Sequence, residues 1–156
     1  MGSVTDLAVQ CLNAVAADAA VQAFCQKSYG RGPSLIHGID PENPPGQGDY
    51  PIVAVTDAVR STSLARNAAE YTLGFLVAVN NETVTTAGGL TTYRGMVEAG
   101  DLAELVEAAV IAHLRRQFPR ISLEAETGVE SDYPLFGGLI TITAAAAGSS
   151  RTPLYR

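Results

Sequence analysis

The sequence contains no tryptophan and only one lysine, Lys27, among its 156 residues. Ten basic residues stand against sixteen acidic ones, which gives a formal net charge of −6 at pH 7. Proteins bind nucleic acid mainly through clustered lysine and arginine side chains, so this balance argues against DNA or RNA as the main partner.

Long apolar runs are also missing, and cysteines are few. No run reaches the roughly 18 apolar residues of a membrane-spanning helix, and the N-terminus lacks the basic flank of a signal peptide. Cys11 and Cys25 both fall in one helical region. In a single helix they would lie about 21 Å apart, too far for a disulfide. We therefore expect reduced thiols and no membrane association.

Signatures of catalysis are sparse. The two histidines, His37 and His113, show no metal-ligand spacing such as HExxH, and there is no P-loop pattern. The glycine pairs lack the strand–GxGxxG–helix context of a dinucleotide site. The sequence predicts a protein that is not an enzyme and uses no cofactor or metal.

A second hypothesis of a different class remains open. A pocket between the central helix and the sheet could make the chain a small enzyme or a ligand-binding domain. Its candidate polar groups are Asp49, Asp57 and His113.

The strongest helical pattern covers residues 101–118. Apolar residues recur there at spacings of three and four, Asp101 and Glu104 fit a capping box, and Pro119 prevents continuation. At about 1.5 Å per residue the helix would span roughly 26 Å, enough to cross a small sheet. We expect it to be the central helix of the domain.

A second helical stripe begins near Thr5 and ends at Gly30, Gly32 and Pro33. Within it, Asp18 either caps a further helical segment or marks a bend. The remaining predictions, in chain order, are a short extended stretch (34–39), a Pro- and Gly-rich loop (40–49), a buried strand (51–56), an exposed loop or short helical turn (57–70), an alternating strand (71–79), a projecting hairpin (80–94), a strand (121–126), a turn (127–132) and a final strand (139–147).

This order of elements predicts an α+β fold. We expect a mixed or mainly antiparallel sheet of about four to five strands packed against two main helices. A hydrophobic content of 47% and a length of 156 residues suit a single domain, 1–156. Residues 148–156 are expected to form a loose C-terminal tail.

Loops and turns supply the candidate contact residues. If the loops around the strand of residues 71–79 converge, their arginines could form a basic rim for an acidic partner. The projecting hairpin has a two-glycine turn, and the long loop is Pro-rich, as contact segments often are. The candidate interface residues are Arg60, Arg66, Gly88, Gly89, Arg94, Pro44 and Pro45.

Four acidic residues, Glu98, Asp101, Glu104 and Glu107, follow one side of the central helix. A solvated acidic face is the simpler interpretation, and a protein-docking face is the alternative.

Several phrases of the sequence resemble one family. They are GIDPEN…DYPIVAV, EYTLGFLVAV, YRGMVEAGDLAELVEAAVIAHL and SDYPLFGGLITIT. Together with the order of elements they resemble the tail terminator, or tail-completion, proteins of long-tailed bacteriophages and prophages. The resemblance covers residues 7–144, and its motifs are patterns of apolar residues and turns.

The resemblance implies a chemically silent structural protein of the virion, assembled in the cytoplasm of the bacterial host. Copies of the chain would form a ring, usually six-fold, that caps the tail tube, ends tail polymerisation and joins the tail to the head connector. The implied partners are a second copy of the chain, the tail tube protein and a head-completion or connector protein. Another ring-forming phage component, such as a head-closure adaptor or tail-tube subunit, is a further alternative.

Overall fold

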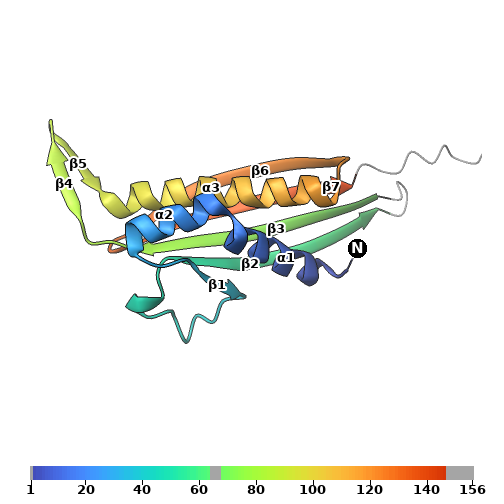
Figure 1. The fold of residues 1–156 in the computed structure, drawn as a ribbon, viewed down its shortest axis with the longest axis horizontal. Helices are drawn as coiled ribbons and strands as arrows, with labels where there is room; N and C mark the ends of the chain where they lie inside the picture. Colours follow the sequence, from blue (N-terminus) through green and yellow to red (C-terminus); the bar gives the residue numbers. More distant parts are fainter. Residues whose placement is uncertain (1, 64–67, 147–156) are drawn as a thin grey trace, which may run out of the picture.

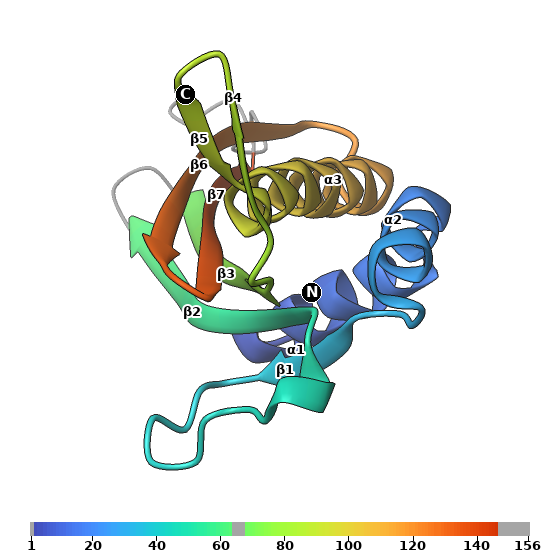
Figure 2. The same cartoon turned by 90° about the vertical axis from the view of Figure 1, so that its left-hand side faces the viewer.

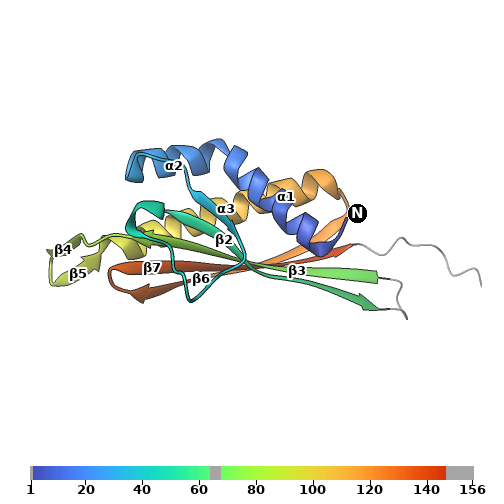
Figure 3. The same cartoon turned by 90° about the horizontal axis from the view of Figure 1, so that it is seen from below.

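Three helices cover one face of a five-stranded sheet, and a two-stranded hairpin projects from one end (Figures 1 and 3). The computed structural model describes residues 2–63 and 68–146. The elements are α1 (Val4–Ala17), α2 (Ala19–Tyr29), β1 (Ser34–His37), the 3₁₀ turn η1 (Gln47–Asp49), β2 (Ile52–Ser63), β3 (Ala68–Asn80), β4 (Val84–Ala87), β5 (Leu90–Tyr93), α3 (Arg94–Gln117), β6 (Ile121–Asp132) and β7 (Leu135–Ala146). The predicted α+β fold is confirmed, with three helices instead of two.

The order of strands in the main sheet is β1-β2-β3-β7-β6. β1 runs parallel to β2, whereas the other neighbouring pairs are antiparallel. The sheet is therefore mixed, and β1 and β6 form its two edges.

The core lies between the sheet and the helices. The apolar alternation over residues 71–79 corresponds to strand β3, in which every second side chain points toward the helices and is buried. The buried β3 residues are Tyr71, Leu73, Phe75, Val77 and Val79. Helix α3 contributes its predicted stripe, with Leu102, Val106, Val110 and Leu114 all buried.

Helix α3 begins at Arg94, so the predicted start at Asp101 is wrong. Tyr93 is the N-cap residue and no side chain caps the helix, so Asp101 has no capping role. The early turns are helical because they pack on the sheet. A Cβ atom at Gly95 would lie only 2.2 Å from the ring of Phe136 in β7, which shows how closely α3 approaches that strand. At about 1.5 Å per residue, 24 helical residues span roughly 36 Å.

The segment 57–70 is strand wherever it is described, so the predicted loop or helical turn is wrong. β2 continues through an irregularity between Val55 and Asp57 and reaches Ser63. This half of β2 is exposed apart from half-buried Ala58, because the β2–β3 hairpin extends past the helices there (Figure 3). A strand that is exposed on both faces loses the apolar alternation by which strands are predicted.

The predicted turn at residues 127–132 is also wrong, since β6 runs unbroken to Asp132. Tyr133 and Pro134 make the turn, and β7 begins at Leu135. The face of β6 that points away from the helices is acidic and carries Glu124, Glu126, Glu130 and Asp132. The predicted loose tail, 148–156, lies outside the described residues.

Asp18 caps a separate helix, α2, which was one of the two alternatives predicted from the sequence; the other was a bend in a single helix. The Oδ1 atom of Asp18 accepts a hydrogen bond of 2.9 Å from the backbone N–H of Val21. The axes of α1 and α2 differ by 63°. Among the described helices no single one is long and apolar enough to cross a membrane, and α1 and α2 meet that criterion only when counted together.

Cys11 and Cys25 are free, fully buried thiols. Burial raises the pKa of Cys11 to about 12 and that of Cys25 to about 11. The thiolate is the reactive form, so we expect neither thiol to react with DTNB at pH 8 in the native protein, and both to react after unfolding in urea. Rapid absorbance change from the native protein would contradict the buried placement.

Candidate functional site

The β4–β5 hairpin stands away from both layers of the domain (Figure 1). Gly88 and Gly89 form its turn with φ angles of 58° and 79°, a backbone that favours glycine and suits a two-residue hairpin. The predicted hairpin and its turn are confirmed. Every hairpin residue is exposed except half-buried Thr92, so the hairpin presents both faces to solvent.

Large apolar side chains are exposed along the hairpin and at its base. We call Leu90, Tyr93, Met96, Val97 and Tyr133 the hairpin cluster; the exposed fraction ranges from 39% for Met96 to 68% for Leu90. The rings of Tyr93 and Tyr133 meet edge to face with their centroids 5.5 Å apart. A shallow cavity of about 290 Å³ lies beside Tyr93, Met96 and Val97. Large apolar side chains that are exposed in one region of a protein surface often mark a protein contact.

A second apolar feature lies on the face of the sheet opposite the helices. The chain between β1 and β2 folds over that face and encloses a cavity of about 210 Å³, the loop pocket. The side chains of Ile52 and Ala54 point away from the helices but are buried, because the loop between β1 and β2 covers them. The apolar lining of the pocket consists of Ile36, Ile39, Pro45, Ile52, Ala54, Leu76 and Ala78.

The loop over this pocket is held by its own hydrogen bonds. The carboxylate of Asp40 accepts from Asn43 Nδ2 at 2.8 Å and from the backbone N–H of Glu42 at 3.0 Å. Those bonds lower the pKa of Asp40, that from the Asn43 side chain most. Arg31 donates to Ser34 Oγ at 2.6 Å and to the carbonyl of Gly48. The pocket therefore has a defined wall.

Glu98 lies in a polar cluster at the same end of the domain, and its predicted place on a solvated face is wrong. It is only 8% exposed and accepts hydrogen bonds from the Tyr29 hydroxyl and from Asn81 Nδ2, the latter at 3.0 Å. Arg94 Nε lies 3.7 Å from Glu98 Oε1. Burial and the bond to Glu98 raise the pKa of Tyr29. The cluster joins the end of α2 and the end of β3 to the first turn of α3, which fixes the base of the hairpin.

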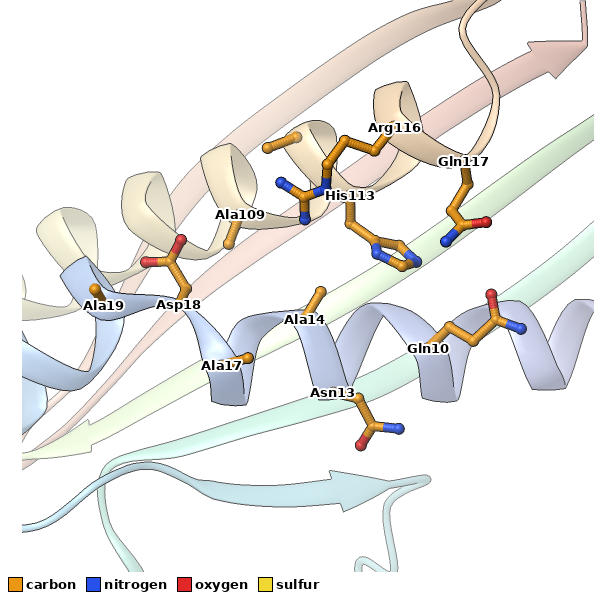
Figure 4. A pocket seen from close by; sticks show the side chains of 11 residues that line it. Gln10, Asn13, Ala14, Ala17, Asp18, Ala19, Ala109, His113, Arg116 and Gln117 are labelled. Carbon is orange, nitrogen blue, oxygen red and sulfur yellow. The ribbon is translucent and has the colours of Figure 1, made fainter.

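A groove between α1 and α3 is lined by one of the two histidines, His113 (Figure 4). It measures about 630 Å³, and His113 points into it from α3 beside Arg116 and Gln117, opposite Gln10 of α1. His113 Nε2 is buried without a hydrogen-bond partner among the described residues. Asp49 and Asp57 do not line this groove, so the three polar groups of the second hypothesis are not brought together.

His113 should make stability depend on pH. Burial, and secondarily the charge of Arg116, lower its pKa below 6.5 in the folded state. The unfolded state then binds the proton more readily, so stability should fall as the pH drops below about 6.5. We expect the urea midpoint to be lower at pH 5 than at pH 7.5, and the difference to be smaller in His113→Gln. An unchanged pH difference in that variant would remove His113 as the cause.

The arginines of the predicted basic rim do not converge. Arg60 lies in the far half of β2, whereas Arg94 begins α3 at the opposite end of the sheet (Figure 1). Arg66 lies outside the described residues. Pro45 lines the loop pocket and its neighbour Pro44 is exposed in the same loop.

Sequence reasoning found the hairpin turn and the long loop but missed the two apolar features that they form. Met96 and Val97 read as ordinary helix residues, and nothing in the local sequence shows that they are exposed. No group of three or more His, Cys, Asp or Glu side chains in residues 2–63 and 68–146 is placed to hold a metal ion.

Comparison with protein-family models gives no match, and comparison with curated protein sequences gives none either.

Proposed function

We propose that this chain is a structural protein of the tail terminator type, which forms a ring on the tip of a phage or prophage tail tube. The ring, six-fold as the resemblance implies, ends tail polymerisation and joins the tail to the head connector. The observation that carries the proposal is the β4–β5 hairpin, an uncharged arm with exposed apolar residues at its tip and base.

A subunit in a closed ring needs surface that is buried only by its neighbours. The hairpin cluster supplies apolar side chains of the types enriched at interface centres, two tyrosines and a methionine among them. An isolated two-stranded hairpin has little stability of its own in water. Packing against another molecule would give the β4–β5 hairpin the apolar contacts that its own domain does not provide.

The fold class agrees with the proposal. The resemblance to tail terminators, which itself includes the order of elements, implies an α+β fold with a mixed or antiparallel sheet packed on helices, and this chain has a fold of that class. The resemblance supplies the class of assembly, whereas the exposed hairpin supplies a physical means of assembly.

Light scattering coupled to size exclusion, followed by negative-stain microscopy of the same concentrated sample, tests the proposal. We expect ring-shaped particles with a central hole and a mass several times 16.2 kDa. A strict monomer that also fails to bind tail tubes from the same phage would contradict it. Incorporation along the length of the tube, rather than at its tip, would favour a tail-tube subunit instead.

The groove between α1 and α3 favours a second candidate, a ligand-binding domain. The buried Nε2 of His113 lacks a partner among the described residues and could accept or donate a hydrogen bond to a small polar ligand. A ligand that binds the native state raises its melting temperature. A metabolite panel should therefore raise the melting temperature of the natural chain and not that of His113→Ala; a panel without any shift would reject this candidate.

A further inference from the structure

We propose that the copies of this chain join head to tail, with the tip of the β4–β5 hairpin of one copy inserted into the loop pocket of the next. Leu90 is the side chain that enters the pocket. This inference rests on the proposed ring and assigns its contact.

Leu90 has the features of an anchor residue. It directly follows the Gly88–Gly89 turn, and at 68% it is the most exposed of the large apolar side chains described. Thr86 and Thr91 face each other across the hairpin with their hydroxyl oxygens 3.1 Å apart, which supports the arm that carries it. Four residues per strand give this arm a length of about 13 Å.

The loop pocket suits such a side chain in size and chemistry. Its volume is about 210 Å³. An apolar cavity of about 150 Å³ holds a molecule as large as benzene, so a leucine side chain has room. The lining is mainly aliphatic, and residues 83–93 carry no charged side chain. Insertion of the tip therefore buries no unpaired charge of its own.

The positions of hairpin and pocket decide which molecule is the occupant. The base of the hairpin contacts the β6–β7 turn through Tyr93 and Tyr133, whereas the pocket lies over β1, β2 and β3. The pocket therefore lies toward the β1 edge of the sheet and the base of the hairpin toward the β6 edge. Figure 2 shows the hairpin and the loop on opposite flanks of the same end of the molecule. A hairpin of about 13 Å held on one flank is directed away from its own pocket.

A second copy of the chain satisfies both features at once. Each copy offers one tip and one pocket. In the head-to-tail arrangement the copy that receives the tip is not the copy that fills the pocket, so the contact is heterologous. Heterologous contacts repeat head to tail and close into a ring when the rotation between neighbours permits. A two-fold dimer in which each tip enters the other copy's pocket would pair the same surfaces but would stop at two copies, so covalent products larger than a dimer distinguish the ring from it.

The tip is an anchor and not the whole interface. A stable interface covers about 800 Å² on each partner, more than one leucine supplies. The other residues of the hairpin cluster, Tyr93, Met96, Val97 and Tyr133, lie at the base of the arm and would contact the outside of the neighbour's loop. A central anchor surrounded by weaker contacts is the usual distribution of energy in an interface.

Disulfide trapping tests this contact in the full chain. Leu90→Cys and Ile39→Cys replace an exposed tip residue and a 53% exposed residue of the pocket lining. We expect a 1:1 mixture of the two single variants to give a covalent dimer on mild oxidation, and the double variant to give a ladder that ends at the ring number. The natural thiols do not compete, since Cys11 and Cys25 are fully buried.

The matched control pairs Leu90→Cys with Val9→Cys, an exposed position on α1, and should give no covalent dimer. Rings without a trapped Leu90–Ile39 pair would overturn the docking contact and leave the proposed ring intact. Covalent dimers from Leu90→Cys alone would also overturn it, because they require two tips to meet. Natural chain that forms no ring, fails to bind tail tubes and gives no trapped pair would overturn both proposals.

Discussion

Shortening the β4–β5 hairpin to its turn should abolish ring formation and leave the domain folded. The variant deletes Thr85–Ala87 and Leu90–Thr92, so that Val84-Gly88-Gly89-Tyr93 remains. Val84 and Tyr93 are directly paired, and the two glycines already occupy a left-handed turn that can close that pair. Five of the six removed residues are exposed and the sixth, Thr92, is half-buried, so the core loses little.

The loss of an anchor and of the arm that carries it should weaken self-association at least roughly a hundredfold. Sedimentation of the shortened variant over a range of concentrations measures this effect, and thermal unfolding checks that the domain is intact. The matched control is Thr86→Val/Thr91→Val, which keeps the length of the arm and its β-branched side chains and replaces only the paired hydroxyls by methyl groups. Undiminished rings from the shortened variant would exclude the hairpin from the interface.

Replacing Gly138 by valine should destabilise the whole domain. A Cβ atom at this position of β7 would lie 2.6 Å from Val77 Cγ2, 2.7 Å from Ala103 Cβ and 3.0 Å from the carbonyl oxygen of Ala99. The last contact is to the backbone of α3, so the helix itself would have to move off the sheet. Overpacking of this kind costs about 3 kcal/mol, which lowers the melting temperature of a domain of this size by roughly 6–12 °C.

Gly128→Val provides the matched control. It introduces the same side chain into the neighbouring strand β6, where a Cβ atom meets nothing within 4 Å. We expect unchanged or slightly raised stability there, because valine favours strand backbone more than glycine does. Equal losses in the two variants would show that the close approach of α3 to β7 is not what requires glycine at position 138.

Local signals in the sequence were sufficient for several elements. The alternation over residues 71–79 predicted β3, and Asp18 gave the start of α2 as one of two alternatives, the other being a bend in a single helix. The Gly88–Gly89 pair predicted the hairpin turn, because few other residues adopt that backbone. In each case neighbouring residues alone determine the feature.

Tertiary packing decided what the sequence did not reveal. The first turns of α3 are helical because Gly95 lets them lie against Phe136, a residue about forty positions away in the chain. The acidic spacing in α3 suggested a solvated face, but Glu98 is buried by partners from α2 and from the end of β3. Strand β2 was predicted too short because its far half is exposed apart from half-buried Ala58. Strand β6 was predicted too short because residues 127–132 contain only one large apolar side chain, Val129.

The candidate site was only partly predictable for the same reason. The hairpin and the Pro-rich loop were expected to be contact segments, because their glycines and prolines indicate a turn and an irregular loop. The loop pocket, by contrast, is lined by residues of β1, the loop, β2 and β3, so no single segment of the sequence predicts it. The predicted basic rim required that the loops carrying the arginines converge. Arg60 and Arg94 instead lie at opposite ends of the sheet, so they do not form such a rim.

Addition of the purified protein to growing phage tail tubes tests the proposed terminator function most directly. The length of the tubes and the structure at their ends are read by negative-stain microscopy, with the shortened-hairpin variant in parallel. The account predicts that the natural chain stops elongation and leaves a ring at one end of each tube, and that the variant does neither. Tubes that continue to grow with bare ends in the presence of excess natural chain would contradict it.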